Sequence, residues 1–172
     1  MTRTTDAGTT DMPLWRSLLY VPATAERFVA KAADRGADGV ILDLEDSIPP
    51  DGKAAARAAL ATAVPTVAAG GCEVLVRINR PWRLALPDLE ASVIAGVTGL
   101  CLPKVDSLHH LVEIDQVVSE LEAERDLPVG RIRFCVLVET AQGIAEAACR
   151  NPTPRRWRRT RRRSGWRRAR PG

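Results

Sequence analysis

The sequence lacks the cysteine spacing that zinc sites and redox motifs use. Its four cysteines are widely separated and form no C-x-x-C pair; they are Cys72, Cys101, Cys135 and Cys149. Cys101 and Cys135 lie inside apolar segments, where cysteine usually behaves as a small hydrophobic residue. This distribution argues against a zinc site or a disulfide framework, and it favours the reducing cytoplasm as the location of the protein.

Long apolar segments are also missing. No stretch reaches the ~18 consecutive apolar residues that a membrane-spanning helix needs, so we expect no membrane partner. The first twelve residues, Met1 to Met12, are polar and contain no apolar core of the kind that signal peptides have. We therefore expect residues 1–12 to be a disordered leader.

Acidic residues are absent from the end of the chain. Residues 1–149 carry 14 Lys and Arg against 21 Asp and Glu, which gives a net charge of −7. Residues 150–172 carry 11 arginines and no acid, which gives +11, and the two parts together account for the +4 of the whole chain. We expect this Arg-rich tail to be disordered, because it is highly charged and poor in aliphatic residues.

Short apolar segments alternate with segments of helical character between residues 13 and 149. The expected strands are residues 17–22, 39–45, 73–79, 99–104 and 133–140, and the expected helices are residues 23–35, 51–69, 86–95 and 107–125. The last helix has Leu111, Ile114, Val118 and Leu121 on one face, with Asp106 or Ser107 as its cap.

The expected strands are nearly continuous apolar runs, such as VILDL and VLVRI. Such runs are typical of a parallel sheet that is buried on both faces, and the alternation with helices predicts an α/β fold. No G-x-G-x-x-G follows the first strand, which disfavours a dinucleotide-binding sheet. The pattern alone does not separate a doubly wound sheet from a (β/α)8 barrel.

Charged side chains occur where four of the expected strands end. They are Asp43, Glu45, Asp46, Arg77, Lys104 and Glu139. Any one of them would be explained by a helix cap or a solvated loop. Four strands that all end in this way favour a shared polar pocket, because the carboxyl ends of the strands carry the chemistry of α/β barrels. His109 and His110 are adjacent on an expected helix, and we interpret both as surface residues.

Arg77 and Glu139 are the candidates for substrate and metal binding. Arg77 follows three apolar residues, and its planar guanidinium group suits a carboxylate. Glu139 follows a buried strand, where a carboxylate needs a partner or a cation, and its hard oxygen atoms suit Mg²⁺. Together they predict a site for a small oxo-acid or hydroxy-acid chelated to a metal. An Arg77–Glu139 or Arg77–Glu45 ion pair is the structural alternative.

Five motifs occur along this region in a fixed order. They are RSLLYVP at residues 16–22, ADGVILDLEDS at 37–47, VRIN at 76–79, LPKV at 102–105 and VETA at 138–141. The series resembles the HpcH/HpaI aldolase and citrate lyase β-subunit superfamily over residues 13–149. The resemblance implies a TIM (β/α)8 barrel, of which these residues form the first five (β/α) units.

The resemblance also implies an activity and a set of residue roles. The reaction is the Mg²⁺-dependent cleavage of a carbon–carbon bond in a 3-hydroxyacyl-CoA thioester of the citryl or malyl type. Arg77 would bind the carboxylate of the oxo-acid or hydroxy-acid, and Glu139 would be one of two Mg²⁺ ligands. Asp43, Glu45, Asp46 and Lys104 would support the pocket. Arg16, Lys53 and Arg57 match basic positions near the CoA moiety or a subunit contact, which leaves a homo-oligomer open.

The sequence departs from this family after Cys149. The family's second metal ligand is an Asp in a Gly-rich motif after the sixth strand, but no acid follows Glu146 here. We therefore expect an incomplete barrel and an inactive chain. The tail, residues 150–172, begins where the sixth strand is due, which favours a GC-rich gene read out of frame. The alternative function is nucleic-acid binding by this basic tail, with Trp157 and Trp166 available for stacking, on a degenerate half barrel.

Overall fold

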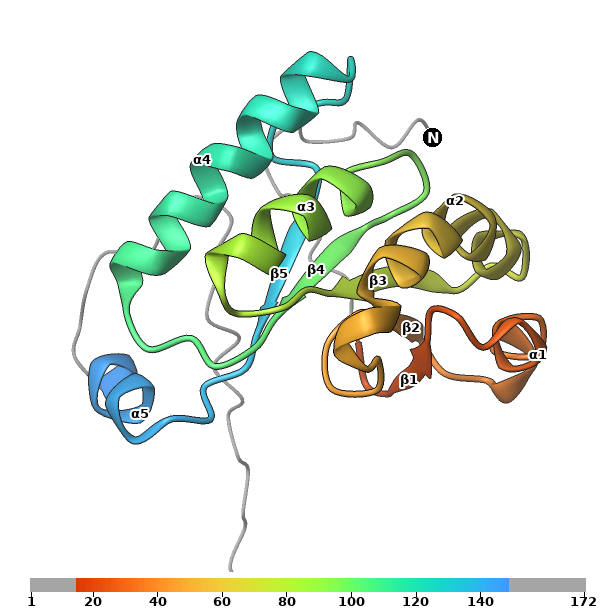
Figure 1. Ribbon diagram of the computed structural model, residues 1–172, viewed down its shortest axis with the longest axis horizontal. Coiled ribbons are helices and arrows are strands. Elements are labelled where there is room, and N and C mark those ends of the chain that lie inside the picture. The colour runs from red at the N-terminus through yellow and green to blue at the C-terminus, as the bar shows by residue number, and fades with distance from the viewer. Residues whose placement is uncertain (1–14, 149–172) are drawn as a thin grey trace, which may run out of the picture.

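One parallel sheet organises the part of the chain that the computed structural model describes, residues 15–148. Its strands are β1 (Leu18–Pro22), β2 (Gly39–Asp43), β3 (Glu73–Arg77), β4 (Gly99–Leu102) and β5 (Arg133–Val136), in the spatial order β1-β2-β3-β4-β5 (Figure 1). All four pairings are parallel. The predicted α/β class is confirmed, and the predictions for the leader and the Arg-rich tail lie outside the described residues.

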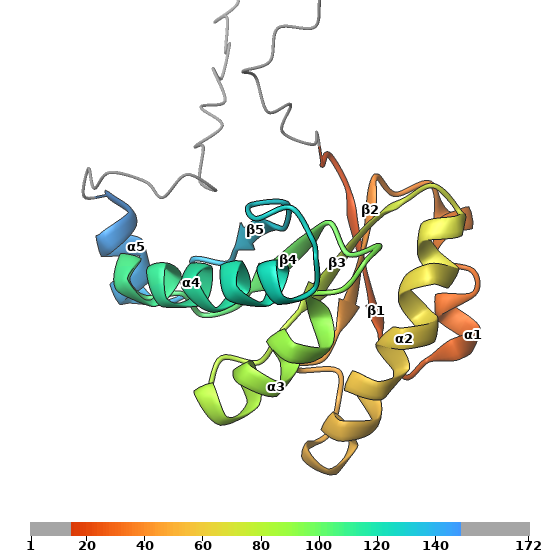
Figure 2. The ribbon, with the colours of Figure 1, turned by 90° about the horizontal axis from the view of Figure 1, so that it is seen from above.

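A helix follows each strand, and the first four helices lie along one side of the sheet. They are α1 (Glu26–Val29), α2 (Lys53–Ala69), α3 (Trp82–Ser92), α4 (Leu108–Glu124) and α5 (Ala141–Ala148), with short 3₁₀ turns at Ala33–Arg35 and Pro50–Gly52. Figure 2 shows α1 to α4 arranged along the same side of the curved sheet. Within residues 15–148, no helix has both the length and the apolar character needed to cross a membrane.

Two predicted helices differ from the structure. The expected helix at 23–35 is only the single turn of α1 followed by a 3₁₀ turn. The expected helix at 86–95 begins earlier, at Trp82, because Pro81 precedes its first residue and Pro87 lies in its second turn rather than at its start. By contrast, the hydroxyl of Ser107 accepts a hydrogen bond from the backbone N–H of His110 and caps α4, so Ser107 is the cap of the two candidates that the sequence offered.

The alternation of side chains along the strands divides the core in two. On the helix-covered face, Val40, Leu42, Val74, Val76, Leu100 and Leu102 pack into the main core, together with the predicted face of α4. On the other face, which we call the helix-free face, Ile41, Leu75 and Cys101 form a second buried cluster against Trp15, Leu18, Cys135 and Leu137. Both faces are therefore apolar, which explains the continuous hydrophobic runs of the strands.

Candidate functional site

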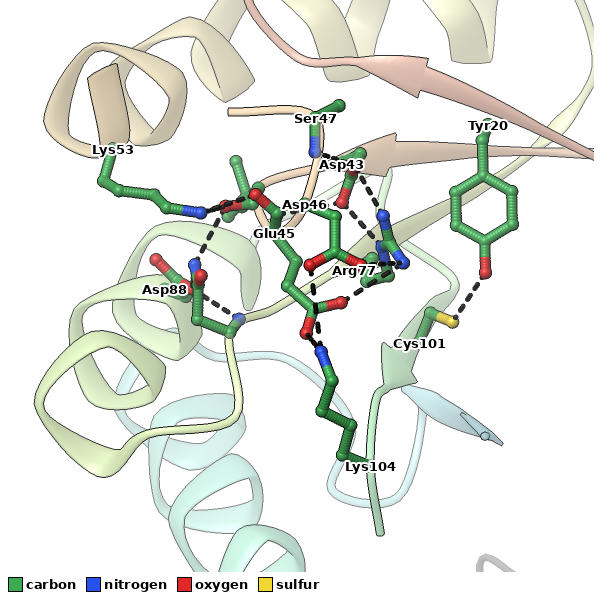
Figure 3. A network of polar contacts seen from close by, with 12 residues as sticks. Tyr20, Asp43, Glu45, Asp46, Ser47, Lys53, Arg77, Asp88, Cys101 and Lys104 are labelled. Carbon is green, nitrogen blue, oxygen red and sulfur yellow. Dashed lines mark hydrogen bonds and ion pairs between the residues drawn. The ribbon is translucent and has the colours of Figure 1, made fainter. Parts of the chain in front are cut away.

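The carboxyl ends of β2 and β3 hold a paired acid and base. Asp43 and Arg77 are register partners, each at the last position of its strand. Arg77 donates from Nε and Nη2 to the two carboxylate oxygens of Asp43, both at 2.7 Å (Figure 3). Asp43 also accepts hydrogen bonds from the backbone N–H groups of Glu45 at 2.9 Å and Ser47 at 3.1 Å. The carboxylate is thus held on all sides.

The charge state of this pair follows from its contacts. Burial alone would raise the pKa of Asp43, but the hydrogen bonds from Arg77, Ser47 and Glu45 outweigh it and lower the pKa to about 2. The hydrogen bond to Asp43 raises the pKa of Arg77 above its ordinary value. Both groups are therefore ionised at neutral pH. The sequence placed both residues at this edge but did not identify Asp43 as the main partner of Arg77.

Glu45 lies between two cations. Its side chain is only 7% exposed, and its Oε1 is 2.6 Å from Nζ of Lys104 while its Oε2 is 3.2 Å from Nη1 of Arg77. Figure 3 shows the Glu45 carboxylate between these two side chains. Asp46 faces the same cations at longer distances, 3.5 Å to Arg77 and 3.8 Å to Lys104, and its side chain is 68% exposed. The Arg77–Glu45 ion pair that the sequence offered as an alternative is therefore present, as a second contact.

Lys104 connects this cluster to Glu139. Its ammonium group binds Glu45, and its backbone N–H donates to Oε1 of Glu139 at 2.9 Å. The backbone of Lys104 has a φ of +50°, a left-handed conformation that is uncommon for residues other than glycine. Glu139 itself is exposed. The described residues show no direct Arg77–Glu139 ion pair, but Glu45 and Lys104 connect the two residues along one edge of the sheet.

Buried polar residues support this edge from below. Nζ of Lys53 donates to the backbone carbonyls of Leu44 and Glu45, and Nδ2 of Asn79 donates to the same Leu44 carbonyl at 2.9 Å. Asp88 accepts from the backbone N–H and the side chain of Asn79, at 2.8 and 2.6 Å. The segment after β2 is thus held directly by the buried Lys53 and Asn79, and the buried Asp88 in turn holds Asn79.

The three basic residues that the sequence placed near the CoA moiety or a subunit contact lie in different places. Lys53 is buried beneath the segment after β2, and Arg57 forms an ion pair with the buried Asp88 at 3.0 Å. Arg16 precedes β1 and binds Asp38, which precedes β2, at 2.6 Å. Arg16 is therefore at the opposite edge of the sheet from Arg77. The structure brings none of the three into contact with Arg77 or Glu139.

Sequence reasoning missed three residues around the cluster. The Tyr20 ring lies 4.8 Å from the guanidinium carbon of Arg77, in a cation–π contact, and its hydroxyl is 3.5 Å from Sγ of Cys101. Asn79 and Asp88 are buried, but a polar residue in an amphipathic pattern does not by itself indicate burial. The interpretation of His110 as a surface residue is wrong, because its side chain is buried edge-to-face against Trp82. His109, by contrast, is 83% exposed.

The donor set fits a magnesium ion held by few protein ligands. Three carboxylates and two cations make the Asp43–Glu45–Asp46–Arg77–Lys104 cluster net negative, and Glu139 adds another acid at the same edge. Within the described part of the chain, no three His, Cys, Asp or Glu side chains are arranged to hold a metal by themselves. Mg²⁺ is often bound by one or two carboxylates, with substrate and water completing the shell, and the exposed Glu139 suits such a site.

Comparisons with known proteins point to one family. The family model described as HpcH/HpaI aldolase/citrate lyase matches residues 16–149. Citrate lyase subunit beta from Leuconostoc mesenteroides subsp. cremoris is 33% identical over 138 residues, which cover 78% of this chain and 45% of that protein. A (3S)-malyl-CoA thioesterase from Cereibacter sphaeroides is 37% identical over 137 residues, which cover 78% and 44%. The chain thus spans less than half the length of these curated relatives.

A solved structure agrees with both the sequence matches and the fold. The citrate lyase beta subunit of M. tuberculosis, complexed with oxaloacetate and magnesium, matches with a TM-score of 0.55 and 34% identity. The match covers 78% of this chain and 53% of that one. The five-stranded sheet and its helices therefore correspond to about half of a TIM-barrel-like protein, as the sequence predicted.

Proposed function

Because this chain belongs to the HpcH/HpaI aldolase/citrate lyase family, we propose that it carries part of the active site of a Mg²⁺-dependent carbon–carbon lyase. The proposed substrate is a 3-hydroxyacyl-CoA thioester of the citryl or malyl type, which is cleaved in a reversible Claisen-type reaction. The names of the relatives, a citrate lyase subunit and a malyl-CoA thioesterase, support this substrate class. The cytoplasmic location and a homo-oligomeric state stay predictions.

One observation carries the proposal. An unbroken series of contacts runs along the carboxyl ends of β2 to β5, from Arg77 through Glu45 and Lys104 to Glu139. This is the edge at which α/β barrels carry their chemistry. A carboxylate-binding guanidinium group and an exposed magnesium-type ligand thus lie at one edge, as an oxo-acid chelated to a metal requires.

Arg77 is held so that one side of its guanidinium group remains for a substrate. Asp43 occupies Nε and Nη2, which fixes the plane of the group. Nη1 has looser contacts, 3.2 Å to Glu45 and 3.5 Å to the largely exposed Asp46. We infer that the carboxylate of the oxo-acid binds at Nη1 and displaces Asp46, because Asp46 has the longest contact and loses the least by moving into water.

Glu139 is the proposed magnesium ligand in this chain. Its hydrogen bond from the Lys104 backbone orients the carboxylate, and its exposure leaves it accessible. Magnesium bound there would polarise the oxo-acid and stabilise negative charge that develops on its oxygen. Lys104 and Glu45 keep Glu139 and Arg77 at a constant separation, so their role is positional. Lys53 and Arg57 act by supporting this edge.

We further infer that these 172 residues by themselves bind Mg²⁺ weakly and show no measurable turnover. The sequence has no Asp or Glu after Glu146, so a second carboxylate of the kind that the family uses must come from elsewhere. The described residues offer no complete ligand set. The expected result is no release of acetyl-CoA from citryl-CoA or malyl-CoA by the purified chain, measured by chromatography with and without Mg²⁺. Full turnover by this chain would contradict the inference.

A chimera tests the lyase proposal itself. In the chimera, residues 13–149 of this chain replace the matching segment of the Leuconostoc citrate lyase β-subunit. The rest of the Leuconostoc protein supplies the remainder of the site. We expect the folded chimera to cleave citryl-CoA or malyl-CoA only with Mg²⁺ present, and to lose this activity when Arg77 is changed to Ala. A folded chimera that binds neither oxaloacetate nor Mg²⁺ would contradict the proposal.

A further inference from the structure

Two thiols meet on the helix-free face of the sheet, and one of them, Cys101, is also the register partner of Arg77. Cys101 on β4 and Cys135 on β5 are register partners, so their side chains leave neighbouring strands at the same level and on the same side. Adjacent strands lie about 4.8 Å apart. This spacing falls within the ~4.4–6.8 Å between Cα atoms that a disulfide requires. Both cysteines are free in the structure.

The two thiols differ in their surroundings. Cys101 is fully buried, next to the Tyr20 hydroxyl, whereas Cys135 is partly exposed. Interaction with the neighbouring Cys101 thiol lowers the pKa of Cys135 against the opposing effect of burial. The same interaction, followed by burial, raises the pKa of Cys101. Cys135 is therefore the thiol that reaches the thiolate form more easily and is also the more accessible one.

We propose that Cys101 and Cys135 form a dithiol site that hydrogen peroxide oxidises to an intramolecular disulfide. The Cys135 thiolate attacks one peroxide oxygen, the O–O bond breaks, and Cys135 becomes a sulfenic acid while the second oxygen leaves as water after protonation. Cys101 then attacks the Cys135 sulfur, loses its proton and displaces a second water molecule. The two thiols lose two electrons, and one peroxide is reduced to two water molecules.

Cys72 provides an internal comparison. Its thiol lies 3.6 Å from the carbonyl oxygen of Ala37 and 3.9 Å from that of Ala33, and no second thiol of the described residues is paired with it. The sequence predicted that Cys101 and Cys135 behave as small hydrophobic residues, and both do lie in the apolar cluster of the helix-free face. The dithiol proposal does not rest on the lyase proposal, because oxidation of the two thiols needs neither magnesium nor a thioester, although Cys101 is the register partner of Arg77.

The test uses the full chain with Cys72→Ser and Cys149→Ser, so that only the two paired thiols remain. The protein is treated with hydrogen peroxide, freed of peroxide and then alkylated. We expect its mass to be 2 Da below that of the untreated protein before alkylation, with no alkylated cysteine. Tryptic digestion without reduction should join peptide 84–104, which contains Cys101, to peptide 134–150, which contains Cys135. Reduction should separate them.

Single variants in this background test the order of the steps. With Cys101→Ser, Cys135 should stop at the sulfenic acid, which dimedone traps. With Cys135→Ser, oxidation of Cys101 should be at least ~10-fold slower, since a buried, protonated thiol is a poor nucleophile. Circular dichroism checks that each variant is folded; if one is not, the mass and cross-link of the two-thiol protein decide alone. Two alkylatable thiols after peroxide treatment, or a disulfide only between separate chains, would overturn the proposal.

Discussion

Asp43 and Arg77, the last residues of two neighbouring parallel strands, share two hydrogen bonds of 2.7 Å each. The Asp43 side chain is 2% exposed and that of Arg77 is 15% exposed. A buried pair of this kind adds little stability over an apolar pair, but loss of one partner leaves an uncompensated charge. The pair therefore sets the orientation of Arg77, and with it the geometry of the proposed carboxylate site.

Replacement of Asp43 tests this relationship. Asp43→Asn should lower the free energy of unfolding by about 3 kcal/mol, because Arg77 would lose its main charged partner in a largely buried place. Asp46→Asn is the matched control and should change stability by less than about 0.5 kcal/mol, because Asp46 is 68% exposed. Urea unfolding followed by circular dichroism measures both. Equal effects of the two variants would refute the assigned importance of Asp43.

The lowered pKa of Asp43 predicts a loss of stability at acidic pH. Its pKa is about 2 in the folded protein, against an ordinary value of 3.8. A lowered folded pKa contributes stability above the unfolded pKa, and this contribution is lost as the pH falls through the folded value. Between about pH 4 and pH 2, the wild type should lose about 2 kcal/mol more than Asp43→Asn. Parallel pH profiles for the two proteins would show that Asp43 is not responsible.

The lowered pKa of His110 predicts a second loss of stability, at a milder pH. Burial, followed by the nearby Arg80, lowers the pKa of His110, while Asp106 and Glu113 oppose this shift more weakly. The folded protein therefore favours the neutral ring, and stability present above about pH 6.5 should be lost as the pH falls towards 5. His110→Phe should remove this loss, whereas His109→Gln should retain it. Urea unfolding at both pH values distinguishes the variants.

Replacement of Lys53 shows whether this residue supports the fold or contacts CoA. Lys53→Met keeps the aliphatic stem but removes the hydrogen bonds to the Leu44 and Glu45 carbonyls. We expect a loss of about 1–3 kcal/mol in unfolding free energy. In the chimera, Lys53→Met should change two KM values by the same factor. One is the KM for the full CoA thioester, and the other is the KM for a thioester that lacks the nucleotide part of CoA. A selective rise in the KM for the full CoA thioester would indicate direct contact instead.

Replacement of Glu139 tests its assignment as a magnesium ligand. In the chimera, Glu139→Gln should reduce Mg²⁺-dependent cleavage at least ~100-fold, because the amide keeps the shape of the side chain but loses its charge. Glu146→Gln, on the exposed surface of α5, is the control and should keep full activity. Titration with Mn²⁺ in the presence of oxaloacetate should show the same loss of metal affinity. Unchanged affinity in Glu139→Gln would remove Glu139 from the ligand set.

Much of the site was predictable because its position depends on local patterns. Continuous apolar runs identify buried parallel strands, and the residue that follows such a run must lie at the carboxyl edge of the sheet. Arg77, Lys104 and Glu139 could therefore be assigned to one edge from the amino-acid pattern alone. The buried face of α4 and its Ser107 cap were predictable for the same reason, since both depend on spacing within a single helix.

The partners of these residues depended on the tertiary structure. Alternation along a strand tells which face a side chain occupies, but only the register between strands shows that Arg77 meets Asp43 and that Cys101 meets Cys135. The burial of His110 likewise depends on Trp82, which belongs to a different helix. The sequence by itself determined the order of strands and helices and the edge that carries the polar residues, because these follow from spacing within one segment. The tertiary structure decided which charges, thiols and rings touch, because those contacts join residues that are far apart in the chain.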